Sequence, residues 1–278
     1  MPHSTPLKRN PAFVFGPPIA LGILGALMLI QSAFAGPRLD IIQQRLESVE
    51  STNQSIARAP LTSHTFPRLM MGNASSIFVL VNKHNQIEPF NFEPSDLVVV
   101  KTSKSLDNSR GLELSKPAAQ ALTAMAKDMH AQGQGRMFLN SAFRSSSYQE
   151  RLFASKIKEY GRAGALLRSA KAGFSEHQTG LAADVSVPEQ GCAIMTCFGD
   201  TKAGVWISEN AWRYGFIVRY EETTRDITGY SYEPWHLRFV GAEVARLYSE
   251  NGMQTLEELW GVPAAPDYLP EITASTSN

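Results

Sequence analysis

One ten-residue stretch, SEHQTGLAAD from Ser175 to Asp184, limits the structures that this chain can form. Gly180, followed by the Ala-Ala-Asp-Val-Ser-Val run, predicts a turn that leads into a strand, because glycine suits tight turns and the following residues alternate in polarity. With a two-residue period, Asp184 lies on the polar face of a half-buried strand, and His177 lies over it from the turn. The apolar face of that strand would consist of Leu181, Ala183, Val185 and Val187. A histidine and a carboxylate so placed could supply two of the three protein ligands of an open zinc site.

A second segment, Tyr232 to Val240, offers the third ligand. Its apolar residues at 235, 237 and 239 alternate with His236, so His236 faces away from the predicted core. Glu233 precedes His236 by three residues, and in a regular strand these two side chains would face opposite sides. If both act at one metal, the chain must bend at Pro234.

These four residues together make chemical sense as a hydrolytic centre. His177, Asp184 and His236 would hold zinc with one position open, and the carboxylate of Glu233, which is not a ligand, would take a proton from an activated water. Taken singly, each residue also has an ordinary explanation: Asp184 could cap a turn, and Glu233 could be a solvated loop carboxylate. Arg144, which follows the strand predicted over 137–139 and could face a cleft, could likewise be a surface cation.

Composition excludes some classes of function. Of the 278 residues, 43% are hydrophobic, which excludes a chain that is disordered throughout. Lys plus Arg and Asp plus Glu number 26 each, so the net charge gives no indication of a nucleic-acid partner. His64, His84 and His130 receive no role.

The ends of the chain are predicted to lie outside the globular domain. Lys8 and Arg9 precede an apolar run that ends in an Ala-x-Ala step, so residues 1–35 are predicted to be a signal peptide or membrane anchor. Either one exports the rest of the chain to the periplasm or cell envelope, with attachment to the inner membrane if the segment is retained. We expect an amphipathic helix and linker over 36–75, a catalytic domain over 76–262 and a flexible tail over 263–278.

Within the domain, periodicity predicts helices and strands in alternation. A continuous apolar run predicts a strand over 77–82, and shorter runs predict strands over 137–139 and 216–220. Helical spacing predicts helices over 116–129, 148–160, 162–171, 203–214 and 242–251. Cys192 and Cys197 fit a local disulfide that pins a loop in an oxidising compartment, with two free buried thiols as the alternative.

Four sequence blocks resemble those of a known family. SAFRSSSYQERLF, SEHQTGLAADVS, NAWRYGFIVRY and GYSYEPWHLRFVG, in this order, resemble the motifs of the VanY-type D-alanyl-D-alanine carboxypeptidases, zinc peptidases of bacterial cell walls. The resemblance spans about Ile77 to Gly261. It departs in the first block, where Ala142 and Phe143 replace the more usual Gly and Tyr.

The resemblance implies a fold and a set of roles. The fold is α+β, a small antiparallel sheet with packed helices, as in the hedgehog/DD-peptidase-like zinc peptidases. One Zn²⁺ would bind His177, Asp184 and His236, with Glu233 as the catalytic base. Arg144, Gln149 and Ser175 carry over as substrate-binding positions.

The function expected from residues and resemblance is removal of the terminal D-alanine from peptidoglycan stem peptides. The same site could serve an L,D-carboxypeptidase or an endopeptidase, because that distinction lies in loops such as 190–203. A wall-binding module without catalysis is the alternative of another class. It would be expected to have lost the base, whereas this chain retains Glu233. The sequence gives no indication of oligomeric state.

Overall fold

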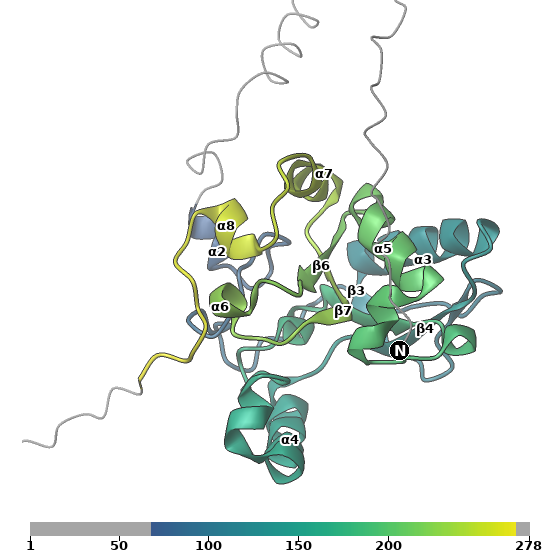
Figure 1. Ribbon diagram of the computed structural model, residues 1–278. Coiled ribbons are helices and arrows are strands. Elements are labelled where there is room, and N and C mark those ends of the chain that lie inside the picture. The colour runs from purple at the N-terminus through teal and green to yellow at the C-terminus, as the bar shows by residue number, and fades with distance from the viewer. Residues whose placement is uncertain (1–67, 271–278) are drawn as a thin grey trace, which may run out of the picture. The chain divides into compact units, whose positions relative to one another are not determined.

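The computed structural model describes residues 68–270 (Figure 1). The predicted signal or anchor and most of the predicted helix and linker lie outside these residues. Within the described range, no helix is both long and apolar enough to cross a membrane.

A five-stranded sheet forms the centre of the domain. Its strand order is β2-β4-β5-β7-β6, and every pairing is antiparallel except that of β2 with β4. The strands β1 and β3 form a separate two-stranded antiparallel sheet. The prediction of an α+β fold with a small antiparallel sheet is confirmed, and the parallel pairing of β2 with β4 is the departure from it. The strand bounds are β1 Leu97–Val99, β2 Leu106–Asp107, β3 Glu113–Ser115, β4 Met137–Ser141, β5 Ala182–Ser186, β6 Phe216–Tyr220 and β7 Glu233–Phe239.

Helices surround this sheet, and most of the predicted ones are present. Pro117 lies in the first turn of α3, where its missing N–H costs no helical hydrogen bond. The helix predicted over 203–214 is α5 continued by the 3-10 turn η4, and those predicted over 148–160 and 162–171 are one element, α4, with a break at Gly161 (φ 69°) and an end at Leu166. The α-helix bounds are α2 Arg68–Met71, α3 Lys116–Ala131, α4 Ser146–Leu166, α5 Lys202–Asn210, α6 Arg225–Thr228, α7 Ala242–Glu250 and α8 Leu256–Trp260. The 3-10 helices are η1 Glu176–Thr179, η2 Pro188–Gln190, η3 Thr196–Asp200 and η4 Ala211–Tyr214.

The two faces of the sheet differ in chemistry. One face packs on α3 and α5 in the main hydrophobic core, and both helices stand beside the strands in Figure 1. This face is apolar because alternate residues of β5, β6 and β7 point towards it, among them Val185, Val218 and Leu237. The opposite face carries the intervening residues, including Asp184, His236 and Arg238. The candidate site is built on this second face.

Residues 77–82 do not form the predicted strand. They begin in a turn, at residues 77 and 78, and then run irregularly, and Leu80 and Val81 are buried. Their backbone bonds differ from those of a strand: the carbonyls of Ile77 and Val79 accept from Nη2 of Arg238, at 3.2 and 2.6 Å. The prediction failed because a buried arginine, not a neighbouring strand, satisfies these carbonyls.

The strand β5 is not half-buried as predicted. All five of its residues are buried, because the face that carries Asp184 is covered by other polar and charged side chains instead of solvent. Asp184 on β5 is therefore held inside the protein, among polar partners.

The flexible tail predicted over 263–278 begins with residues that pack on the domain. Ala265 is fully buried, and its N–H donates to the carbonyl of Ile227. The carbonyl of Pro266 accepts from Nζ of Lys83 at 2.9 Å, and the hydroxyl of Tyr268 accepts from the N–H of Lys171. The folded domain therefore extends to Tyr268, past the predicted boundary.

Candidate metal centre

His177, Asp184 and His236 meet on the polar face of the sheet. His177 lies in η1, which Gly180 ends in a left-handed conformation (φ 68°), and Asp184 on β5 is paired directly with His236 on β7. Oδ2 of Asp184 lies 3.2 Å from Nε2 of His177, and Oδ1 lies 3.1 Å from Nδ1 of His236. One atom from each residue can be chosen so that all three lie within 4.8 Å of one another.

The second nitrogen of each imidazole is held by a fixed partner. Nδ1 of His177 is 2.7 Å from the carbonyl oxygen of Ala142, an acceptor, so Nδ1 carries the proton and Nε2 presents its lone pair to the cluster. Nε2 of His236 lies 3.3 Å from Oε2 of Glu176. This is the usual arrangement behind histidine metal ligands, because it fixes both ring orientation and tautomer.

The donor set fits Zn²⁺. Ligand atoms around tetrahedral zinc lie about 3.3 Å from one another, close to the separations between Asp184 and each histidine. Nε2 of His177 and Oδ1 of Asp184 are buried and make no hydrogen bond in the described structure, although the two side chains lie next to each other. Two buried polar atoms without a hydrogen bond are suited to bind a metal ion. Two imidazoles and one carboxylate leave a fourth position open, as in catalytic zinc sites.

The charges of the three residues favour a cation. Burial and the nearby Arg144 guanidinium lower the pKa of His177 to about 4, so its imidazole is neutral at pH 7. Burial opposes ionisation of Asp184, but the two histidines hold the pKa of its carboxyl well below the usual range. Burial likewise opposes protonation of His236, yet its contacts with Asp184 and Glu176 raise its pKa to about 9. A metal ion that binds His236 must therefore displace a proton.

Glu233 is brought to the same site by an irregularity in β7. The register pairs Val218 with Leu237 and then Tyr220 with Glu233, so Arg219 alone is opposite residues 234–236. The strand β7 thus has two more residues than β6 in this interval, and they lie at and after Pro234, where the sequence analysis required a bend. Oε2 of Glu233 lies 3.6 Å from Nδ1 of His236, and burial raises the pKa of Glu233 to about 8. A carboxyl group with a pKa near neutrality can both accept and return a proton.

Arg144 and Ser175 line a cleft of about 730 Å³ that also contains the cluster and Glu233. Arg144 lies just after β4, its backbone N–H donates to the carbonyl of His177, and Nη1 donates to Oγ of Ser141 at 3.2 Å. Its Nε is buried without a hydrogen-bond partner in the described structure. A guanidinium with an unused donor in a cleft suits an incoming carboxylate.

Gln149, the third predicted substrate residue, lies behind the wall of this cleft and is fully buried. Its amide nitrogen donates to Oγ of Ser169 at 3.2 Å and to the carbonyl of Ala170 at 2.7 Å. Since Ser169 and Ala170 do line the cleft, the structure gives Gln149 an indirect part: it holds their loop in place.

A buried charge network, which sequence reasoning missed, supports His236 from behind. We use this name for Glu176, Arg219, Arg238 and Glu257, each at most 2% exposed. Oε1 of Glu176 accepts from Arg219 at 2.9 Å and from Arg238 at 2.8 Å, while Glu257 on α8 takes two hydrogen bonds from Arg219 at 3.0 and 2.8 Å. The sequence did contain a signal for this network: Arg219 and Arg238 each lie within a largely apolar strand segment. An arginine in such a segment is almost never fully buried unless it is paired with a carboxylate.

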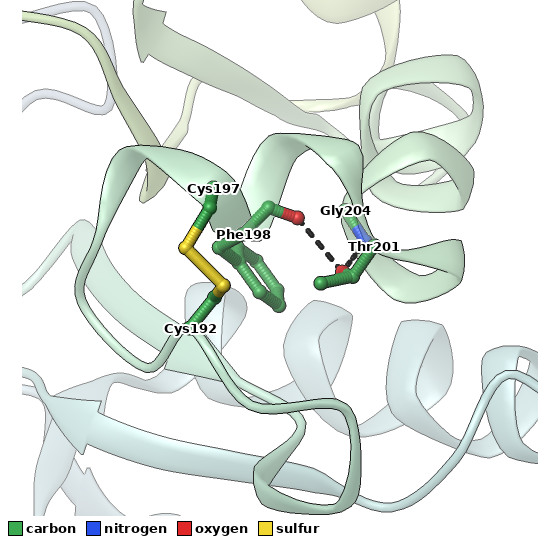
Figure 2. Close-up of a disulfide and its surroundings, with 5 residues drawn as sticks. All are labelled: Cys192, Cys197, Phe198, Thr201 and Gly204. Atoms are coloured by element: carbon green, nitrogen blue, oxygen red, sulfur yellow. Dashed lines mark hydrogen bonds between the residues drawn. A yellow bond between two sulfur atoms is a disulfide. The ribbon is translucent and has the colours of Figure 1, made fainter.

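Cys192 and Cys197 form a disulfide in the loop beside the cleft (Figure 2). The loop is anchored at its end, where the buried Phe198 accepts at its carbonyl from Oγ1 of Thr201, which in turn accepts from the N–H of Gly204. Residues 194–196, between the two cysteines, line the cleft. The disulfide thus pins part of the cleft wall.

Comparison with known proteins shows the family to which this chain belongs. The VanY family model, described as D-alanyl-D-alanine carboxypeptidase, matches residues 111–242. The protein YodJ of Bacillus subtilis is 40% identical over 187 residues, which cover 67% of this chain and 67% of YodJ. The chain belongs to the VanY D-alanyl-D-alanine carboxypeptidase family. As a VanY-family chain it is an enzyme, a peptidase of the carboxypeptidase type.

Two solved structures also resemble this VanY-family chain. The LdcB LD-carboxypeptidase is 38% identical with a TM-score of 0.61, and the match covers 68% of this chain and 87% of LdcB. A mutant of the vancomycin resistance D,D-pentapeptidase VanY, solved in complex with Zn(II), is 30% identical with a TM-score of 0.54, over 65% of this chain and 96% of that one. The fold expected from the sequence blocks is therefore confirmed.

Proposed function

We propose that this chain is a zinc-dependent D-alanyl-D-alanine carboxypeptidase that removes the C-terminal D-alanine from peptidoglycan stem peptides. One observation carries the proposal: the carboxylate of Glu233, which is not needed as a ligand, lies 3.6 Å from a candidate ligand atom of His236, in the cleft that Arg144 also lines. A base beside a metal cluster suits hydrolysis, and a cation within the same cleft suits a peptide with a free C-terminus.

His177 through Nε2, Asp184 through its carboxylate and His236 through Nδ1 would hold the ion. When bound, Zn²⁺ supplies a Lewis acid that polarises the scissile carbonyl and makes water more acidic. Glu233 takes a proton from the attacking water and then returns it to the leaving amine of D-alanine. Proton return to the amine completes cleavage of the peptide bond.

The remaining residues select and orient the substrate. Arg144 binds the free C-terminal carboxylate in a fork, which restricts cleavage to the last peptide bond. Ser175 orients the peptide backbone in the cleft, and Gln149 fixes the loop of Ser169 and Ala170 that forms one wall. The positions of these side chains in and behind the cleft support the proposed roles.

A second candidate, an L,D-carboxypeptidase that acts on tetrapeptides, uses the same centre. The likeness to LdcB, at 38% identity, favours it specifically. The two activities differ in the stereochemistry accepted on the upstream side of the scissile bond, and hence in the cleft wall, of which the disulfide loop forms part.

We also propose that the domain acts outside the cytoplasm, in the cell envelope. The basic and apolar pattern of residues 1–35 supports export. A disulfide between Cys192 and Cys197 suits an oxidising compartment. Cell fractionation followed by N-terminal sequencing tests this proposal: an uncleaved protein in the cytoplasmic fraction contradicts it.

The activity is tested by incubating the full chain with purified pentapeptide and tetrapeptide muropeptides, with and without a chelator, and weighing the products. Loss of one alanine from the pentapeptide that the chelator prevents supports the first candidate, and loss from the tetrapeptide supports the second. The matched variant is Glu233→Gln, which should bind zinc normally and lose hydrolysis. No chelator-sensitive loss of alanine from either substrate would contradict both candidates.

A further inference from the structure

The helix α4 buries few of its side chains. Its buried residues are Ser146, Gln149 and Ala165, and in Figure 1 it projects from the body of the domain away from the other helices. Two large aromatic residues on it, Tyr148 and Tyr160, are 47% and 44% exposed. A helix with so little packing against its own domain and with exposed aromatic rings has a face available for a ligand.

That face is a wall of the catalytic cleft. Tyr148, Leu152, Lys156 and Tyr160 recur every four residues, which places them in one line along the helix, and all four line the cleft that contains Glu233. We call these four residues the α4 stripe. At 1.5 Å per residue, the stripe is about 18 Å long. An extended peptide rises about 3.3 Å per residue, so the stripe is long enough for the four residues that precede the scissile bond of a pentapeptide, about 13 Å.

The far end of the α4 stripe carries positive charge. After the break at Gly161 the chain turns back, and the Arg168 guanidinium lies 4.9 Å from the centre of the Tyr160 ring. Lys156 is paired with Glu159 at 2.9 Å, whereas no carboxylate of a described residue forms a salt bridge with Arg168. Arg168 also lines the cleft. Lys156, Glu159 and Arg168 together thus leave one positive charge over an aromatic ring.

The disulfide loop, which also lines the cleft, differs from the α4 stripe. Ile194 and Met195, which are 41% and 56% exposed, lie within the disulfide loop and are apolar. Peptidoglycan stem peptides are acidic upstream of the scissile bond, for instance at a γ-linked D-glutamate whose α-carboxylate is free. Charge complementarity therefore favours the α4 side over the disulfide loop for this part of the substrate.

We propose that the α4 stripe binds the part of the stem peptide upstream of the scissile bond, and that Arg168 at its far end receives a free carboxylate of that peptide. This inference rests on the proposed function, because it assumes that the substrate's C-terminus lies at Arg144. The stripe runs along α4 from Tyr148, four residues after Arg144, to Tyr160 beside Arg168. With this stripe, the enzyme recognises its substrate by the length of the peptide and by the charge upstream of the scissile bond.

The test measures binding separately from cleavage. Zinc-loaded full chain with Glu233→Gln is titrated by calorimetry with L-Ala-γ-D-Glu-L-Lys-D-Ala-D-Ala, with the same peptide carrying an α-carboxamide on D-Glu, and with N-acetyl-D-Ala-D-Ala. We expect the free carboxylate to tighten binding about two- to fivefold, as exposed ion pairs do, and less so at high salt. Arg168→Ala should abolish this difference, whereas Arg162→Ala, at an exposed position outside the cleft, should retain it.

Tyr160→Ala tests the stripe itself. It should weaken binding of both pentapeptides at least about fivefold and leave binding of N-acetyl-D-Ala-D-Ala unchanged, because the short peptide does not reach that end. Equal affinity for the carboxylate and carboxamide peptides, or equal effects of Arg162→Ala and Arg168→Ala, would overturn the inference. Failure of the wild-type chain to cleave any of these peptides would count against the proposed function alone, since the binding comparison does not depend on cleavage.

Discussion

Replacing Glu176 by Gln probes how far the metal centre depends on the buried charge network. The change keeps the shape of the side chain and removes its charge. Arg219 retains both hydrogen bonds to Glu257. Arg238 is left with uncharged acceptors only among the described residues: the new amide oxygen at position 176 and the backbone carbonyls of Ile77, Val79 and Phe239. Loss of one partner from a buried ion pair costs about 3–5 kcal/mol of stability. We expect Glu176→Gln to lower the free energy of unfolding by that amount.

The same change should weaken zinc binding. Oε2 of Glu176 fixes the ring of His236 through Nε2, at 3.3 Å, and loss of such a partner typically lowers metal affinity about 10- to 100-fold. Both quantities can be measured on one preparation. Urea unfolding of the zinc-free protein gives stability, and competition with a chromophoric chelator gives zinc affinity.

Glu257→Gln is the matched control because it alters the other end of the same network. It also removes a buried charge, from Arg219 and from the Asn82 amide, but it does not contact His236. We therefore expect it to destabilise the fold and to change zinc affinity by less than about twofold. The reasoning is refuted if the two variants weaken zinc binding equally, or if Glu176→Gln costs less than about 1 kcal/mol.

Three further predictions concern other parts of the domain. Arg144→Ala should lower kcat/KM about tenfold to a hundredfold on free-carboxylate peptides, and an equal loss on a C-terminally amidated peptide would argue against a carboxylate clamp. Burial lowers the pKa of Lys83 to about 8, below its usual 10.5, so the unfolded chain binds more protons between these values and stability should rise with pH from about 8 to 10. Urea unfolding of Lys83→Met should lack this rise, and an identical pH profile would contradict it. Replacing both Cys192 and Cys197 by Ser should cost about 2 kcal/mol of unfolding free energy, given the short loop that they close, and an unchanged midpoint would show that the bond does not constrain the unfolded chain.

The three residues that meet at the candidate metal centre could be predicted from the sequence, because a local pattern places each of them. Gly180 ends the turn that carries His177, and two-residue alternation places Asp184 and His236 on one face of their strands. The bend that brings Glu233 to His236 could be stated as a requirement. Its form could not, because the two extra residues of β7 are defined by their pairing with β6, which lies elsewhere in the sequence.

The errors share a physical cause. The apolar, continuous run of residues 77–82 predicts a strand, but Arg238 satisfies the carbonyls of Ile77 and Val79 from 161 and 159 residues away. The predicted start of the tail, residue 263, lies too early in the chain. Pro266 and Tyr268 have the sequence character of loop residues, and only their contacts with Lys83 and Lys171 show that they belong to the domain. The substrate-binding role of Gln149 stays a prediction, and its contacts with Ser169 and Ala170 could not be predicted from the sequence. Long-range polar contacts leave no periodic signature in a single sequence.

The contacts made by Lys83 and Asn82 also determine when the domain can form during synthesis. The Asn82 amide donates a hydrogen bond to Glu257, 175 residues later, and Nζ of Lys83 donates to the carbonyl of Pro266, 183 residues later. Nζ of Lys83 also donates to the carbonyl of Gly229, which precedes the cleft residue Tyr230. A chain emerging from the ribosome therefore lacks these connections until almost all of the domain has been made. The first residues of the domain therefore gain these C-terminal partners only after translation has passed residue 266, so the domain completes its packing late in synthesis.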